Sequence, residues 1–197
     1  RVLRPGLVIG LQGVLREEYA FPLGVNDLTV VGVGGQPSQA TTSGVPNGGG
    51  ATWITPSAGA TSTTTPLVIV KGQATTFQNI YFSSTATAAP CVQLLMDGGG
   101  DPPVDASAEH CAFVNCYFTG ADDGITASGG PNFVTIDGCT FLNFNGTGDI
   151  AIASITGAGV HSLQGWTIKN CEFRGNTRHI QAALTGASIH HNHFTYI

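Results

Sequence analysis

The sequence predicts an all-β fold, a parallel β-helix in which about six to seven coils stack on one another. Three observations predict it. A six-residue phrase returns along the chain, two of its returns come after only 21 and 23 residues, and charged residues make up only 10% of the composition. A unit that recurs and is too short to bury its own apolar face must stack on its neighbours, as the repeats of a solenoid do.

Five copies of the phrase are regular, and each ends in Phe. They occupy residues 77–82, 113–118, 136–141, 168–173 and 189–194. A weaker sixth copy is predicted at residues 28–33. The shortest intervals correspond to one coil, so the longer intervals indicate coils that carry loops.

Inside the phrase, positions 4 and 6 are apolar or small and position 5 is mostly polar, which is the alternation of a strand. Position 1 is also apolar, so the alternation slips once and the strand must bend. The bend falls at position 3, where the residue types tolerate positive φ. These residues are Asn79, Asn115, Gly138, Asn170 and His191. We therefore expect an Asn-rich corner between two strands, with a column of Phe rings inside the coil.

Stacked Asn residues at a corner above interior Phe resemble the right-handed β-helix superfamily of pectate lyases, polygalacturonases and phage tailspikes. The resemblance covers roughly residues 23–197 and implies a single-stranded right-handed parallel β-helix. It implies an architecture rather than an activity, because one fold hosts many chemistries.

The composition limits the partners. The 28 glycines are about twice the average share and the charged fraction is far below the usual quarter, so outer faces of Thr, Ser, Asn, Gln and Gly are expected. With a net charge of −5 and only seven scattered Lys and Arg, nucleic acid is not expected as a partner. No apolar run approaches the ~18 residues of a membrane span, so a membrane partner is not expected either.

The chain is predicted to be one β-helix domain over residues 1–197, with loop insertions at about 36–65 and 97–107. It begins at Arg1 and ends directly after a core phrase. Because the ends of a solenoid need covering, we expect a fragment of a longer chain, or a subunit whose ends are covered by neighbours. The latter predicts a homo-oligomer, either a trimer or an end-to-end stack.

Five cysteines cannot all pair within one chain. Cys116, Cys139 and Cys171 share position 4 of the phrase and are expected to point inward as free thiols. Side chains on neighbouring rungs run side by side and rarely reach the torsion that a disulfide requires. Cys91 and Cys111 are left unassigned.

A second set of strands is predicted at residues 92–94, 125–127, 150–152 and 180–182. Aligning their first residues gathers one set of candidate catalytic residues, Asp122, Asp123, Asp149, Arg178 and His179. In this alignment Asp149 lies between Gly124 and His179. Two carboxylates one or two rungs apart would suit a retaining or an inverting glycosidase, and each would raise the pKa of the other.

Other interpretations of this acidic patch stay open. No cofactor is expected, although the oxygens of the patch could bind Ca²⁺. Residues 120–124 also form an ordinary turn sequence in which Asp caps the backbone. The pair Asp122 and Asp123 resembles the paired Asp of polygalacturonases. However, the Asn-x-Asp, Gly-His-Gly and Arg-x-Lys motifs of those enzymes are absent from this sequence, and the catalytic Arg and Ca²⁺ carboxylates of pectate lyases have no clear match.

Aromatic residues offer candidate ligand-binding positions. Trp53 lies on the predicted first loop, and Tyr81 and Tyr117 share the outward position 5, where their rings could stack on sugars. No metal site is predicted, because His191 occupies the bend while His190 and His193 project from different strands. Surface or subunit-contact histidines are expected instead.

Three functions follow from these observations. The first is a structural or adhesive β-helix of a virion surface or extracellular fibre, tailspike-like, self-associating and contacting glycans. The second is a polysaccharide-degrading enzyme, a glycoside hydrolase or lyase that uses the acidic patch, and the third is a non-catalytic carbohydrate-binding module. Sparse charge and the missing catalytic motifs favour the first and an extracellular or virion location, while enzymatic activity stays open.

Overall fold

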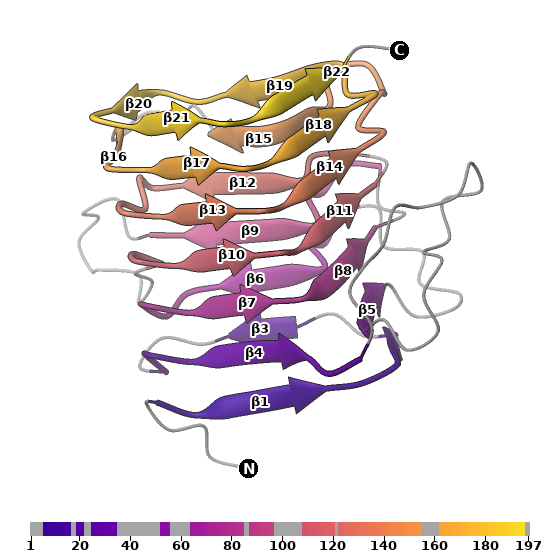
Figure 1. Cartoon of the computed structure of the whole chain (residues 1–197), viewed down its shortest axis with the longest axis vertical. Coiled ribbons are helices and arrows are strands. Elements are labelled where there is room, and N and C mark those ends of the chain that lie inside the picture. The colour runs from indigo at the N-terminus through magenta and orange to yellow at the C-terminus, as the bar shows by residue number, and fades with distance from the viewer. Residues whose placement is uncertain are drawn as a thin grey trace.

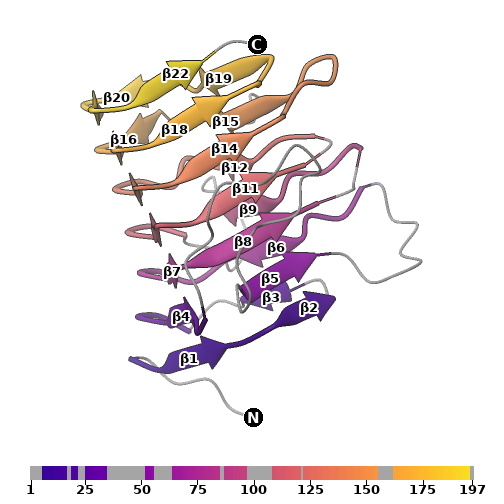
Figure 2. The same ribbon diagram turned by 45° about the vertical axis from the view of Figure 1, so that its right-hand side comes forward.

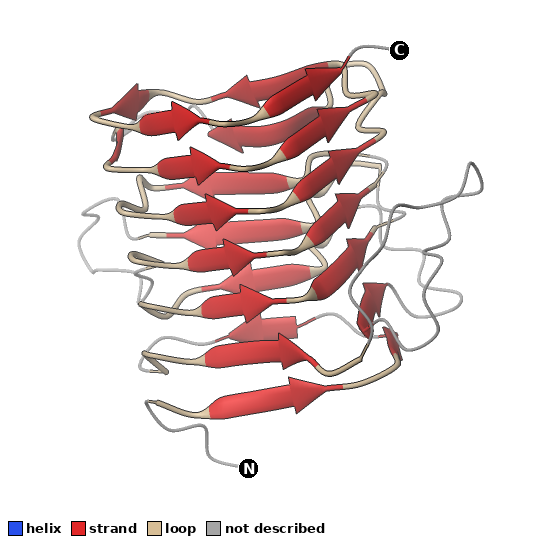
Figure 3. Cartoon of the chain, in the orientation of Figure 1, coloured by secondary structure: helices blue, strands red, loops and turns tan. Residues whose placement is uncertain are grey.

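The computed structural model describes residues 6–16, 19–21, 25–34, 52–55, 64–84, 87–96, 108–120, 122–154 and 162–195. Every regular element in these residues is a β-strand (Figure 3). The described residues contain no helix that is long and apolar enough to span a bilayer. The strands wind upward from the N-terminal end to the C-terminal end, one coil above another (Figure 1).

Three parallel sheets run the length of this stack (Figure 2). The first sheet contains, in stacking order, β1 (Val8–Leu11), β4 (Thr29–Gly32), β7 (Thr76–Gln78), β10 (Ala112–Val114), β13 (Thr135–Asp137), β17 (Thr167–Lys169) and β21 (Ser188–His190). The second contains β2 (Val14–Arg16), β5 (Thr52–Thr55), β8 (Ile80–Ser83), β11 (Tyr117–Thr119), β14 (Thr140–Leu142), β18 (Glu172–Arg174) and β22 (His193–Thr195). The third contains β3 (Tyr19–Phe21), β6 (Val68–Val70), β9 (Val92–Leu95), β12 (Ile125–Ser128), β15 (Ile150–Ser154) and β19 (Arg178–Gln181).

A small fourth sheet pairs β16 (Leu163–Gln164) with β20 (Leu184–Thr185). Each coil from β1 to β19 thus contributes one strand to each of the three walls, the last coil contributes β21 and β22 to two of them, and every strand inside a sheet pairs with its counterparts above and below. The chain is a right-handed parallel β-helix, as predicted, and parallel crossover connections have this hand almost without exception.

The interior is the predicted aromatic column. The rings at position 6 of the phrase, Phe82, Phe118, Phe141, Phe173 and Phe194, stack at successive centroid distances of 4.9, 4.7, 5.0 and 5.0 Å. The first four are fully buried. This column confirms that successive phrases lie in register, because residues one coil apart could not otherwise meet face to face.

The bend of the phrase has the predicted backbone. The residues at position 3 adopt φ of +57° at Asn79, +52° at Asn115, +65° at Gly138, +54° at Asn170 and +55° at His191. A second corner lies three residues before each phrase and also has positive φ. Its residues are Gly6, Asp27, Ala74, His110, Phe133, Gly165 and Gly186. The second corner joins the third sheet to the first.

All five cysteines are buried free thiols. The Sγ atoms of Cys116, Cys139 and Cys171 lie 3.4, 3.4 and 3.6 Å from the carbonyl oxygens of position 1 in the preceding coil. The thiol therefore serves as a small apolar residue with a weak donor. The predicted inward thiol ladder is confirmed.

The first predicted copy of the phrase, at residues 28–33, is out of register. Val30, rather than Leu28, pairs with Phe77, and the second half of this copy is β5, where Trp53 pairs with Tyr81. The loop predicted over 36–65 is therefore wrong at 52–55, which forms a strand. Residues 36–51, 56–63 and 97–107, together with the side chain of Trp53, lie outside the described residues.

The strand pairing confirms the predicted alignment of the second set of strands except at β15. Ile152, rather than Ile150, pairs with both Ile125 and Ile180, and Ile150 pairs with Arg178. Since three apolar residues in a row, at 150–152, are all buried, alternation could not select the inward one. The prediction that Asp149 lies between Gly124 and His179 is therefore wrong.

Candidate functional site

The three predicted carboxylates still meet, in a corrected arrangement at the corner where the chain enters the third sheet. Counting back from the paired residues Ile125 and Ile152 places Ile150 opposite Asp123, and Asp149 opposite Asp122. Electrostatic effects of Asp149 on the pKa values of both Asp122 and Asp123 show that the three groups are neighbours. We call Asp122, Asp123 and Asp149 the acidic corner.

Asp123 joins three coils. Its carboxylate Oδ1 accepts a hydrogen bond of 2.7 Å from the backbone N–H of Ile150, and its carbonyl oxygen accepts one of 2.9 Å from Cys91 N–H. The pKa of Asp123 is raised to about 6, chiefly by burial and also by the charges of Asp122 and Asp149, against the lowering effects of the Ile150 N–H and Arg178. Such a carboxyl is partly protonated near neutral pH, as a general acid must be.

The other two carboxyls differ in their surroundings. Asp149 is buried, and its Oδ2 accepts a hydrogen bond of 2.7 Å from Gly146 N–H, closing the turn that precedes β15. Asp122 is half-exposed, and its pKa is raised by burial and by the charge of Asp149. A backbone hydrogen bond from Asp123 acts on Asp122 as well, so all three carboxylates have a backbone partner, which is the turn-capping role that the sequence also allowed.

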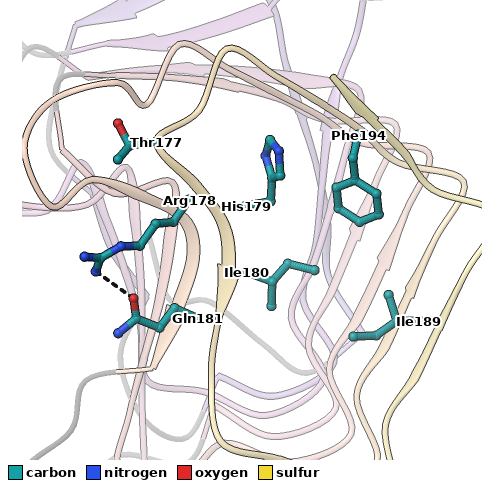
Figure 4. Close-up of a pocket in the computed structure, with 7 residues that line it drawn as sticks. All are labelled: Thr177, Arg178, His179, Ile180, Gln181, Ile189 and Phe194. Atoms are coloured by element: carbon teal, nitrogen blue, oxygen red, sulfur yellow. Dashed lines mark hydrogen bonds between the residues drawn. The ribbon is translucent and has the colours of Figure 1, made fainter. Parts of the chain in front are cut away.

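The remaining two candidates lie at the C-terminal end of the coil. Arg178 and His179 line a hollow of about 500 Å³ together with Thr177, Ile180, Gln181, Ile189 and Phe194 (Figure 4). Arg178 Nη1 donates a 2.7 Å hydrogen bond to Gln181 Oε1. None of the acidic-corner residues lines this hollow.

His179 belongs to the interior rather than to the acidic corner. Its ring lies 5.9 Å from that of Phe173 and 5.3 Å from that of Phe194. Burial lowers the pKa of His179, which favours the neutral ring. The predicted grouping of His179 with the carboxylates is wrong, because the register of β15 places Ala151 rather than Asp149 opposite His179, and the His179 ring packs against Phe173 and Phe194.

The metal alternatives find no support in the described part of the chain. No three His, Cys, Asp or Glu side chains there are arranged to hold a metal ion, the acidic corner included. His190, His191 and His193 are exposed, and the Nδ1 atoms of His190 and His191 lie 2.6 Å apart.

The predicted tyrosine platform is wrong, because both rings are buried. Tyr81 is 0% exposed and Tyr117 is 2% exposed, and their centroids stack at 4.6 Å beside Leu142 on the outer side of the second sheet. Burial also raises the pKa of Tyr81 above its usual range. Neither ring presents a face to a sugar.

An exposed aromatic residue that the sequence analysis missed is Phe133, at the second corner. Its side chain is 49% exposed, and its ring stacks on that of His110 at 4.9 Å. The sequence carried a signal for it, since the residue three places before each phrase forms one column, and Phe133 is the only large apolar member among the described copies.

Comparison with known proteins gives no family. No family model and no curated protein matches the chain. A crystal structure of the pectin methylesterase from Aspergillus niger in deglycosylated form is similar, with 13% identity, a TM-score of 0.41, and coverage of 97% of this chain and 80% of that one. A pectin methylesterase in complex with a hexasaccharide is similar at 14% identity, a TM-score of 0.34, and coverage of 94% and 62%. The assignment of the fold rests on the pairing of this chain's own strands.

Proposed function

We propose that the chain is a structural and adhesive β-helix that contacts glycans through its polar outer walls without cleaving them. One observation carries this proposal: hydroxyl side chains form a registered column on the outside of the first sheet. The paired residues are Thr29, Thr76, Thr135, Thr167 and Ser188, with Ala112 replacing the hydroxyl in one coil.

The geometry of this column suits a carbohydrate. Strands in a sheet lie about 4.8 Å apart, so the hydroxyls repeat at close to the dimension of a sugar ring along the stack. Each hydroxyl can both donate and accept, and all five side chains are at least partly exposed. A ladder of this kind can follow an extended polymer without the enclosed pocket that chemistry requires.

The acidic corner supports the absence of cleavage. Asp123 and Asp149 each bond to a backbone N–H, so these two carboxylates hold coils and turns in place. A virion-surface or extracellular fibre location, and assembly as a trimer or an end-to-end stack, belong to the same proposal. It predicts a stable oligomer, and a monomer in light scattering at micromolar concentration would contradict self-association.

The proposal is tested by affinity electrophoresis in a panel of polysaccharides, followed by analysis of the same polymers for new reducing ends, unsaturated products and released ester groups. We expect retardation of the protein without products. The double variant Thr135→Val/Thr167→Val should lose retardation, whereas Thr140→Val, on the neighbouring wall, should keep it. A wild-type chain that no polymer retards would overturn the proposal.

A second candidate is a glycan hydrolase that uses the acidic corner. The observation that favours it is the Asp123 carboxyl, which lies beside two further carboxylates and has a pKa of about 6. In that case Asp123→Asn abolishes turnover while leaving the fold intact. Unchanged polymers after prolonged incubation with the wild-type chain would exclude this candidate.

A further inference from the structure

The second corner holds one residue in a conformation that its side chain disfavours. Phe133 adopts φ of +57°, a region that is an outlier for a bulky residue and that glycine, Asn or Asp enters far more readily. Strain of this kind is retained where the surroundings enforce it, often at binding sites. The half-exposed ring gains little burial in return.

Three hydrogen bonds enforce this conformation. The backbone N–H of Phe133 donates to the Gln164 carbonyl at 2.8 Å, and Gln164 N–H donates to Asn132 Oδ1 at 2.9 Å. The fully buried Trp166 donates from Nε1 to the Pro131 carbonyl at 2.7 Å. The segment before Phe133 is therefore tied to the next coil, and the ring is held in one place.

The two residues above the ring in this column have no side chains. One side of the Phe133 ring is stacked on His110, and the next two residues in the column are Gly165 and Gly186. A Cβ on Gly165 would lie 2.6 Å from Phe133 Cδ1, so one edge of the ring fills the side-chain space of Gly165, and any larger residue there would displace the ring. A Cβ on Gly186 would meet no atom within 4 Å. The corner is thus a step, with the aromatic ring as its floor and an open position at Gly186.

Polar groups border this step. Gln164 and Thr185 pair in the small fourth sheet directly before the two glycines, and both side chains are exposed. Asn132, beside the ring, donates to Glu109 Oε1 at 3.3 Å. An apolar ring with hydroxyl and amide groups at its edge matches the two kinds of surface that a sugar presents, its C–H face and its hydroxyls.

We propose that the step formed by Phe133, Gly165 and Gly186 binds one neutral pyranose ring of a glycan, stacked on Phe133. This proposal rests on the proposed function, since it names the contact site and class of sugar. A neutral sugar is expected because Glu109 lies at the step and the chain carries a net charge of −5, both of which repel acidic sugars.

The test uses Phe133→Asn, because Asn readily adopts positive φ and relieves the strain while removing the ring. Neutral hexasaccharides of gluco, galacto and manno configuration and an oligogalacturonate hexamer are immobilised and titrated with protein. We expect a neutral hexasaccharide to bind the wild type, Phe133→Asn to lose at least tenfold in affinity, and Phe133→Tyr to retain it. The melting temperature of Phe133→Asn should equal or exceed that of the wild type.

Phe194→Ala is the matched control, since Phe194 is an aromatic residue of similar exposure, 44%, at the end of the coil. It should leave the affinity unchanged. Equal affinity of Phe133→Asn and the wild type would overturn the step while leaving glycan contact itself intact, as would a preference for the acidic hexamer. Failure of the wild type to bind any glycan would overturn the proposed function as well.

Discussion

Residues at the corners decide which backbone conformations each coil can adopt. Asn recurs at the bend because it tolerates positive φ, and Asn170 Nδ2 also donates a 2.8 Å hydrogen bond to Asp137 Oδ1. Gly138 interrupts this series, and Asn115 Oδ1 occupies the space where its side chain would lie, 2.5 Å from the Cβ position. The bend therefore accepts either an Asn or a neighbouring amide that leans over a glycine.

This packing predicts that one substitution of Gly138 is destabilising and that another is tolerated. Gly138→Ala should lower the free energy of unfolding by about 1–2 kcal/mol, because Ala is strained at positive φ. Gly138→Asn should stay within about 0.5 kcal/mol of the wild type, since Asn tolerates this φ and the amide end of Asn115 can rotate away. Urea denaturation of the two variants checks this, and an Asn variant as unstable as the Ala variant would contradict it.

The raised pKa of Asp123 predicts a pH dependence. The folded protein keeps the Asp123 proton up to about pH 6, whereas the unfolded chain loses it near pH 4. Stability should therefore fall as pH rises from about 4 to 6. Asp123→Asn keeps an acceptor for Ile150 N–H and should be about 1 kcal/mol more stable than the wild type at pH 7. This value is smaller than the pKa shift alone would give, because Asp123 is partly exposed to solvent.

Asp137 provides a control, because its pKa is shifted in the opposite direction to that of Asp123. A hydrogen bond from Asn170 and an ion pair with Lys169 Nζ, 3.2 Å from Oδ2, hold the pKa of Asp137 below its usual value. Its contribution is present above pH 4 and is lost as pH falls, so Asp137→Asn should destabilise the protein at pH 7. Denaturation curves at pH 4, 5, 6 and 7 test both variants, and parallel pH profiles for Asp123→Asn and wild type would refute the assignment.

At the scale of the elements, the aromatic column is the main contact between coils. Phe141 is fully buried between Phe118 and Phe173, whereas Phe194, at the end of the same column, is 44% exposed. Phe141→Ala should cost about 3–5 kcal/mol, the range for deleting a buried ring, and Phe194→Ala should cost well under half of that. Thermal and urea unfolding check the difference. Equal losses of unfolding free energy in the two variants would show that contacts within the aromatic column do not hold the coils together.

Elements could be predicted where the repeat is local and uninterrupted. Six adjacent residues determine each inward Phe, each bend and each inward thiol, so these were predicted from the sequence. The predicted strand register was wrong in two places, the first copy of the phrase and β15. The two halves of the first copy, β4 and β5, are far apart in the sequence, and residues 150–152 are all apolar, so the period-2 pattern is lost there.

The site was harder to predict than the fold, because it depends on contacts between coils. A two-residue shift of β15 keeps the three carboxylates together but places Ala151, rather than Asp149, opposite His179. The burial of Tyr81 and Tyr117 depends on how the outer side of the sheet is covered, which alternation does not encode. Phe133 was detectable only by comparing residues that precede the phrase.

For the whole molecule, the architecture and the chemistry point the same way. Three walls of short parallel strands stack into coils around an aromatic column (Figure 1), and the outer side of the first sheet carries a column of hydroxyls. The carboxylates that most resemble a catalytic set are bonded to backbone N–H groups, while hydroxyls and one strained aromatic residue lie outside. The proposed function assigns the hydroxyl-bearing wall to holding a glycan along the stack of coils.

The most direct test is mass spectrometry of a neutral oligosaccharide that has been bound to the wild-type protein, held overnight at pH 6 and pH 7, and eluted. The account predicts saturable binding and recovery of the oligosaccharide at its original mass at both pH values. Shorter or modified products that disappear with Asp123→Asn would contradict it, and would identify the acidic corner as an active site.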